Sequence, residues 1–302
     1  MSKKTCFSRT LQPLLSVMLT LCGELSAADP APVLLHAARV FDGYALHADT
    51  SVLLRNGKVE RIDRPEAFEG LAVKNIELGD ATLLPGLIEL HAHLTFRQVP
   101  ADVVLRHGIT SVRDVGGPLH QPYGGDGRLR LMTSGPILTA PSGYPIPGMG
   151  ETDIAIALVD EQHARETVRR LIKGGAVVIK VALEPGGEAG APWSDGHAHA
   201  HSHQHEPSHQ DSAGWPLLSE SIVKAIVDEA HLQNRKVTAH LAEAKGAQRA
   251  LNAGIDEWAH TPCEALPDAL LKQAVAQGVK VVSTLDTLSK CPGIASNVQR
   301  LT

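Results

Sequence analysis

Two histidines separated by one residue, His91 and His93, follow the largely aliphatic run Leu87–Leu90. Such a run is typical of a buried strand, and side chains two positions apart on a strand point to the same side. Both imidazoles can therefore reach one cation, and two converging neutral imidazoles favour zinc or a similar ion. Taken alone, a His-x-His pattern is common and can equally mark two polar residues at a strand end.

Further ligand-type side chains accompany later aliphatic segments. Lys180 lies within one such segment, and His240 and His260 end two others. Parallel β/α folds gather the carboxyl ends of their strands at one face, where the active site lies. We therefore expect these residues to converge with His91 and His93. The alternatives are polar histidines with ordinary partners at strand ends, and a lysine whose stem is buried while its ammonium reaches solvent.

From residue 84 onward the chain repeats a unit of helix, glycine or polar turn, aliphatic run and polar residue. Alternating strands and helices predict a parallel sheet with right-handed crossovers. We expect an α/β fold, an incomplete (β/α)8 barrel of the TIM type with about seven strands, because eight strands close such a barrel. The expected strands lie near 87–91, 109–114, 129–133, 176–182, 237–240, 255–260 and 279–284.

The first 83 residues have a different character. Residues 1–28 combine a basic start, a short apolar run and small residues near the end, which indicates a secretory signal peptide and a periplasmic or secreted protein. The apolar run is too short for a stable membrane span, and the bulky Leu21 disfavours a lipoprotein. Residues 29–83 contain short apolar runs around an Asn56-Gly57 turn, which is a strong hairpin signal and predicts a small β module.

The bulk composition fits a globular protein rather than a nucleic-acid binder. The net charge is −5, and the chain is 43% hydrophobic but only 3% aromatic, as suits tightly packed aliphatic β/α units. Without the signal peptide, two of the four cysteines remain, Cys263 and Cys291. An oxidising compartment permits them to pair, while buried free thiols are an equal alternative.

A histidine-rich insertion occupies residues 186–216. Histidine tracts bind transition metals, so an exported protein could use this one to collect zinc near its active site. The alternative is a solvated loop whose metal affinity is incidental. The histidines of this tract are His197, His199, His201, His203, His205 and His209.

The run Leu84–His93, the later Lys180, His240 and His260, and the glycine-rich segment 108–117 together resemble the metal-dependent amidohydrolase superfamily. They are most similar to its branch related to imidazolonepropionase and prolidase-like dipeptidases. The resemblance implies that 84–302 form the hydrolase barrel and that the β module is a small β-sandwich.

The resemblance also implies a cofactor of two divalent ions, zinc or a similar metal. His91 and His93 would hold the first ion. His240 and His260 would hold the second, and Lys180 would bridge both as a carboxylated amine, because a carbamate offers two oxygens where an ammonium would repel the cations. The ions would activate a water that attacks an amide or peptide-like carbon–nitrogen bond.

Two departures from the family pattern affect these expectations. The family places a proton-transferring Asp at the end of an eighth strand, so we expect this chain to be a fragment that lacks it and is inactive alone. Residues 139–145 also replace a Gly-Gly-His segment of the dipeptidases, which leaves the substrate open among dipeptides, N-acyl amino acids and cyclic amides. The alternative function is a non-catalytic periplasmic zinc-binding protein that uses the histidine-rich loop. A homo-oligomer also remains open.

Overall fold

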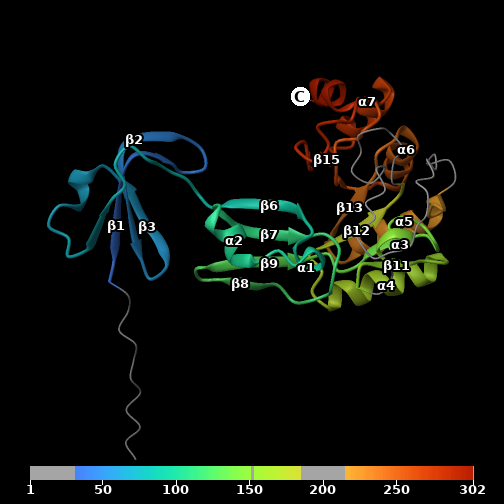
Figure 1. Cartoon of the computed structure of the whole chain (residues 1–302), viewed down its shortest axis with the longest axis horizontal. Helices are drawn as coiled ribbons and strands as arrows, with labels where there is room; N and C mark the ends of the chain where they lie inside the picture. The colour runs from blue at the N-terminus through green and yellow to red at the C-terminus, as the bar shows by residue number, and fades with distance from the viewer. Residues whose placement is uncertain (1–30, 151–152, 185–214, 302) are drawn as a thin grey trace, which may run out of the picture. The chain divides into compact units, whose positions relative to one another are not determined.

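Two compact units make up the chain, Met1–Leu84 and Pro85–Thr302. They are seen in Figure 1, a computed structural model that describes residues 31–150, 153–184 and 215–301. The expected signal peptide at 1–28 and the histidines from His197 to His209 lie outside the described residues and stay predictions. Within the described ranges, no helix is long and apolar enough to cross a membrane.

A single sheet forms the first unit, in the order β3-β2-β1-β4, with β5 also pairing with β1. The β2–β3 hairpin turns at Asn56 and Gly57, whose φ angles of 51° and 71° suit its tight turn and confirm the hairpin expected there. The small β module is therefore present, whereas the second layer of a sandwich stays a prediction. The elements are β1 (Val33–Phe41), β2 (Leu46–Arg55), β3 (Lys58–Asp63), the short helix η1 (Pro65–Phe68), β4 (Lys74–Glu77) and β5 (Thr82–Leu83).

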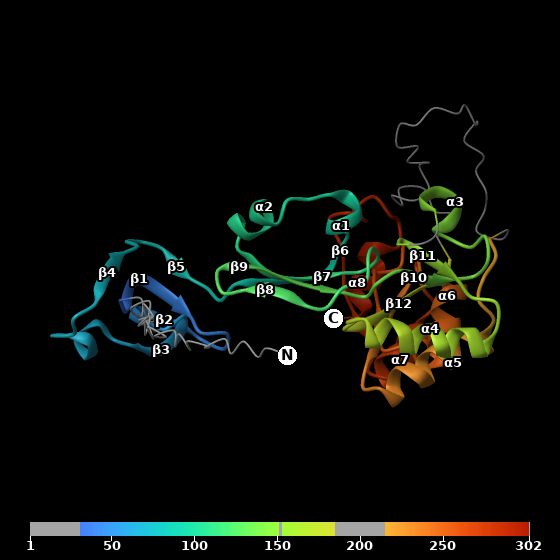
Figure 2. The ribbon, with the colours of Figure 1, turned by 90° about the horizontal axis from the view of Figure 1, so that it is seen from below.

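The second unit begins with a sheet in the order β6-β7-β9-β8. The strands β6, β7 and β9 are parallel, and β8 runs antiparallel to β9. Helix α2 packs on β7 and β9 (Figure 2). The elements are β6 (Leu87–Ala92), α1 (Leu94–Arg97), α2 (Ala101–Arg106), β7 (Ile109–Asp114), β8 (Tyr123–Gly125) and β9 (Arg128–Thr133).

A second, fully parallel sheet follows in the order β11-β10-β12-β13-β14-β15. Its strands are β10 (Ile137–Thr139), β11 (Ala155–Ala157), β12 (Val178–Ala182), β13 (Lys236–His240), β14 (Glu257–Trp258) and β15 (Lys280–Val281). The accompanying helices are α3 (Ile146–Met149), α4 (Glu161–Lys173), α5 (Glu220–Leu232), α6 (Ala244–Ala253), α7 (Asp268–Ala276) and α8 (Ile294–Leu301). The expectation of a mixed α/β fold with a small N-terminal β module is confirmed.

The helices cover the second sheet with their aliphatic faces. Helix α4 starts at Asp160, whose carboxylate accepts the backbone N–H of His163 at 2.7 Å and satisfies a donor that the first turn leaves unpaired. The helices from α4 to α7 pack in succession (Figure 2). Between them and the sheet lies the main core, which includes Leu171, Ile179 and Ile226. Every residue of β12 is buried, as its aliphatic side chains on either side of Lys180 suggest.

The expected strands need two corrections. Each of the seven expected segments contains a strand, but those at 255–260 and 279–284 shorten to β14 and β15, two residues each. The sequence did not predict β10 and β11, and Thr139, the first residue of the segment 139–145, ends β10. The strands form two sheets instead of one continuous ladder. The backbone N–H of Val177 donates to Thr133 O at 2.9 Å and links them.

Cys263 and Cys291 form a disulfide, which decides between the two states that the sequence left open. The pair lies in a small buried cluster with Ala242, Leu288 and Ile294. The bond joins the segment after β14 to the segment before α8.

Reduction of this disulfide should lower the free energy of unfolding by about 3 kcal/mol, because the bond closes a loop in the unfolded chain. The two cysteines are 28 residues apart. Urea unfolding with and without a reductant measures the change, and the double variant Cys263→Ser/Cys291→Ser should not respond to the reductant. An unchanged midpoint in the reduced wild-type chain would contradict the prediction.

Candidate active site

Four histidines meet in the second unit, at or just beyond the carboxyl ends of three strands. His91 lies near the end of β6 and His93 directly follows that strand, while His240 ends β13 and His260 follows β14. The ring centroid of His260 lies 4.6 Å from that of His91 and 4.7 Å from that of His240. The structure therefore brings together the four histidines that the sequence singled out.

The first pair is His91 and His93, whose Nε2 atoms lie 3.3 Å apart. His91 Nδ1 donates to the carbonyl oxygen of Ala259 at 2.8 Å, which leaves the lone pair of its Nε2 facing His93. Two nitrogens bound at about 2.0–2.1 Å to one tetrahedral zinc ion would lie about 3.3 Å apart. The separation of this pair thus fits two ligands of a single cation.

The second pair is His240 and His260. His240 Nδ1 lies 2.9 Å from His260 Nε2, and His260 Nδ1 lies 2.9 Å from the hydroxyl of Thr284, just beyond β15. The ring of Tyr144 lies 4.7 Å from that of His240. Burial raises the pKa of Tyr144 to about 12, so its phenol stays neutral at pH 7.

Lys180 lies on β12 and is 1% exposed. Its Nζ has no hydrogen-bond partner among the residues that the structure describes. Burial lowers the pKa of Lys180 to about 7, the charge of Arg113 lowers it further, and that of Glu257 opposes the shift. A buried amine without a partner is costly, and a neutral amine is the form that can become a carbamate.

His91, His93 and His260 are neutral at pH 7, because their pKa values are lowered in the folded protein. Burial, followed by the positive charge of Lys180, lowers the pKa of His93 to about 3. The pKa values of His91 and His260 lie well below the usual range, chiefly through burial and through neighbouring positive groups that include Lys180. Neutral imidazoles keep the lone pair that binds a metal, and the shared influence of Lys180 places its amine within electrostatic reach of the cluster.

The donor set fits a divalent ion of the zinc type. Within the described ranges, no group of three or more His, Cys, Asp or Glu side chains is already arranged around one cation position. The histidines form two pairs instead, so each pair would need further ligands from Lys180 or from water. Imidazole nitrogens completed by a carbamate or water oxygen are a common zinc environment.

Two functional features were missed from the sequence. The carboxylate of Asp114 is buried and accepts the N–H groups of Leu94 and Thr95, both at 3.0 Å, which fixes the turn after His93. Arg113 and Glu257 form an ion pair beside Lys180. The signal available was the pair of charged residues Arg113 and Asp114 at the end of an expected strand, since charges on buried strands usually have partners.

Residues 82–299 match the model of the Amidohydrolase family. The chain belongs to the Amidohydrolase family. This confirms the resemblance drawn from the Leu84–His93 run.

Known proteins similar to this amidohydrolase include an uncharacterized protein of Mycobacterium tuberculosis, 27% identical over 72% of this chain and 54% of the relative. The chain thus spans about half the length of the curated relatives that it matches. Among solved structures, a Xaa-Pro dipeptidase with bound methionine has a TM-score of 0.63 at 20% identity, covering 90% of this chain and 75% of that one. The ochratoxinase of A. niger has a TM-score of 0.64 at 17% identity, and the match covers 90% of this chain and 73% of the ochratoxinase. These two likenesses show the shared fold.

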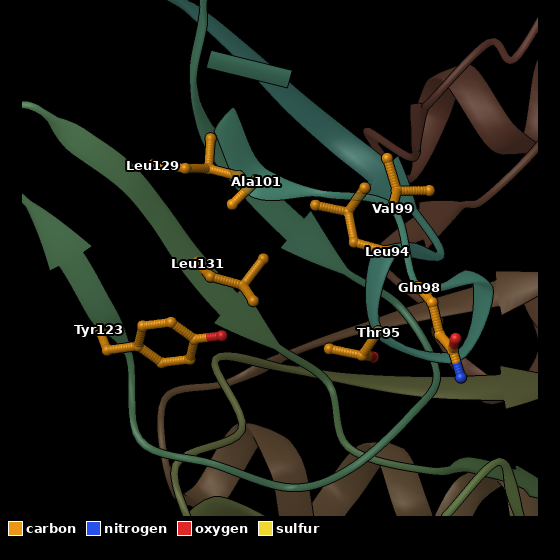
Figure 3. Close-up of a pocket in the computed structure, with 8 residues that line it drawn as sticks. All are labelled: Leu94, Thr95, Gln98, Val99, Ala101, Tyr123, Leu129 and Leu131. Atoms are coloured by element: carbon orange, nitrogen blue, oxygen red, sulfur yellow. The ribbon is translucent and has the colours of Figure 1, made fainter. Parts of the chain in front are cut away.

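A cavity elsewhere in the amidohydrolase is not the candidate site. Figure 3 shows it beside α1 and β9, with Leu94, Leu131 and Tyr123 among its lining residues. The lining contains no histidine, lysine or carboxylate. Such a surface suits an apolar group but offers no metal ligand.

Metal-free amidohydrolase should lose stability as the pH falls from about 6.5 to about 3. The unfolded histidines titrate near 6.5, whereas folded His93 titrates near 3 and folded His91 and His260 titrate well below 6.5. The unfolded state therefore binds more protons over this range, and the free energy of unfolding falls. Urea midpoints measured in EDTA at a series of pH values test this, and a midpoint that stays constant below pH 6.5 would contradict it.

Proposed function

We propose that this amidohydrolase hydrolyses amide or peptide-like carbon–nitrogen bonds with a water activated by two divalent metal ions, zinc or a similar metal. The observation that carries the proposal is the 3.3 Å separation of the Nε2 atoms of His91 and His93 beside a second imidazole pair. His91 and His93 would hold one ion, His240 and His260 would hold the other, and Lys180 in its carboxylated form would serve as a ligand to both. When bound, such ions lower the pKa of a water and polarise a carbonyl.

The chain's own residues supply binding and orientation. The carbonyl oxygen of Ala259 fixes the ring of His91 through the 2.8 Å hydrogen bond, and the hydroxyl of Thr284 contacts His260 at 2.9 Å. Partners on the far nitrogen of a ligating imidazole set its tautomer and ring orientation. Burial of Lys180 keeps a share of its amine neutral at pH 7, as carboxylation requires.

The proposal extends to the whole protein. The two sheets of the second unit would be parts of one (β/α)8 barrel, and an Asp at the end of its eighth strand would transfer the proton to the leaving nitrogen. The support is that the matched curated relatives are about twice as long as the segment matched here. We propose a periplasmic or secreted location on the basis of residues 1–28.

Dipeptides, N-acyl amino acids and cyclic amides are the proposed substrates. One similar structure is a Xaa-Pro dipeptidase, and another is a prolidase in complex with N-methylphosphonate-L-proline. The first name is that of an enzyme for Xaa-Pro dipeptides, whose peptide bond is of the kind that a metal-activated water attacks.

Chelation tests the proposed function. The chain loaded with Zn2+ or Co2+ should hold two ions, and a form extended with an eighth strand and its Asp should hydrolyse at least one member of a panel of the three substrate classes. EDTA should remove the activity and added metal should restore it, because the ions supply the attacking water. Metal binding that survives His91→Ala and His240→Ala but is lost on deletion of residues 186–216 would favour the non-catalytic zinc-binding protein.

A further inference from the structure

Arg113 on β7 and Glu257 on β14 join the two sheets of the second unit. Arg113 Nη1 donates to Glu257 Oε2 at 3.3 Å, and Arg113 Nη2 donates to Glu257 Oε1. Arg113 Nε donates to the carbonyl oxygen of Leu90 at 2.7 Å. The two side chains are only 12% and 13% exposed. One guanidinium therefore holds the backbone of β6 and the side chain of β14 at once.

These contacts lie next to the candidate metal ligands. Leu90 directly precedes His91 on β6. In the register of the second sheet, Lys180 pairs with Thr238, and Thr238 pairs with Glu257, so these three residues form a row on one face across β12, β13 and β14. Glu257 is thus two strands away from Lys180 in this row, and Arg113 contacts the residue that precedes His91.

Among the described strands, no backbone ladder joins the two halves of the site where β6 faces β14. His91 and His93 belong to the sheet of β6, whereas Lys180 and His240 lie in the sheet of β12 and β13, and the ladders do not join β6 to β14. The contacts that cross this gap include the fork of Arg113, the bond from His91 to Ala259 and the ring contact between His91 and His260. Their geometry sets how far the first histidine pair lies from the second.

Stability alone is a weak reason for such a pair. Desolvation of two charges offsets much of their attraction, and replacing a buried ion pair with apolar residues of similar volume is often neutral or stabilising. Arginine suits a positioning role because its planar fork holds several acceptors in fixed directions. The fork of Arg113 contacts three acceptors on two strands.

We propose that the Arg113–Glu257 pair is a positioning pair that sets the separation of the two metal sites, so that both ions can share one bridging ligand. This inference rests on the proposed function and goes beyond it, since neither residue touches a metal ion or the substrate.

The test is a Co2+ titration of the full chain, followed by optical absorption and by EPR, which detects magnetic coupling between neighbouring ions. The wild-type chain should bind two coupled ions. The double variant Arg113→Met/Glu257→Leu should stay folded but bind at least one ion about tenfold more weakly, without coupling. The conservative variants Arg113→Lys and Glu257→Gln should show Co2+ affinities and couplings between those of the wild type and the double variant. They replace the double variant in the test if it does not fold.

The matched control is Lys224→Met/Asp228→Leu, which removes an exposed ion pair on α5 and should leave the cobalt signals unchanged. If the double variant and the conservative variants fold and bind two coupled Co2+ ions with wild-type affinity, the inference is wrong and the proposed function still stands. A wild-type chain that does not take up two ions contradicts both.

Discussion

Replacing Lys180 with methionine should stabilise the metal-free chain while it abolishes metal-dependent hydrolysis in the form extended with an eighth strand and its Asp. The Lys180 amine is 1% exposed and has no partner among the described residues. Its pKa falls from 10.5 to about 7 on folding, so burial of the charged form opposes folding. Methionine has a similar length and flexibility but no charge to desolvate. The free energy of unfolding at pH 7 should rise by a few kcal/mol.

The same substitution removes the proposed bridging ligand. A methionine thioether cannot take up carbon dioxide and offers no oxygen to either ion. Uptake of two ions should therefore fail, and hydrolysis should fall by about a thousandfold or more, because the metal-activated water is lost. Stability and activity thus change in opposite directions, which a general folding defect cannot produce.

Urea unfolding in EDTA, metal content and hydrolysis of the best substrate measure these effects. Lys173→Met, at the exposed end of α4, is the matched control and should change none of them by much. Labelling the wild-type chain with 13C-bicarbonate should give a carbamate NMR signal that the Lys180→Met variant lacks. A destabilised metal-free variant, or one with wild-type metal content, would contradict the role of Lys180.

The pH dependence of the free energy of unfolding provides a second test of the buried Lys180 amine. Between pH 7 and about 10.5 the unfolded chain keeps the Lys180 proton that the folded chain has released. Stability of the metal-free wild type should therefore rise with pH over this window, since the unfolded state binds more protons. The Lys180→Met variant should lack that part of the rise.

The site could be anticipated from the sequence because its residues follow from simple periodicities. The alternation of side chains along a strand places His91 and His93 on the same side, and the gathering of strand ends in parallel β/α folds brings His240 and His260 to them. Lys180 was detectable because it interrupts an aliphatic strand. Each of these signals depends on a few residues that are close together in the sequence, so it can be recognised without knowledge of the tertiary structure.

What could not be anticipated depends on long-range geometry. Arg113 and Glu257 are far apart in the sequence, and their pairing requires that the two sheets face each other. Strands β10 and β11 have three residues each, too few for a periodicity to emerge. The Cys263–Cys291 disulfide was undecided because a single pair of cysteines has no spacing pattern to read.

Replacing His91 with alanine should reduce the metal content from two ions to one. The bond from His91 Nδ1 to Ala259 O directs the Nε2 lone pair toward His93, and the two Nε2 atoms lie 3.3 Å apart. Without His91, the first position keeps His93 as its imidazole, which is a weak ligand set. The second position keeps both His240 and His260 and should stay occupied.

In the form extended with an eighth strand and its Asp, His91→Ala should lower hydrolysis by about a thousandfold. One ion cannot both activate the water and hold the carbonyl as two ions can. Elemental analysis of dialysed protein gives the ion count, and EPR of the Co2+ form should show an isolated ion in place of a coupled pair. His107→Ala, at an exposed histidine after α2, should retain two ions and full activity. If His91→Ala also retains two ions, then the first position is not built on this pair, and the 3.3 Å separation reflects a hydrogen bond between the rings.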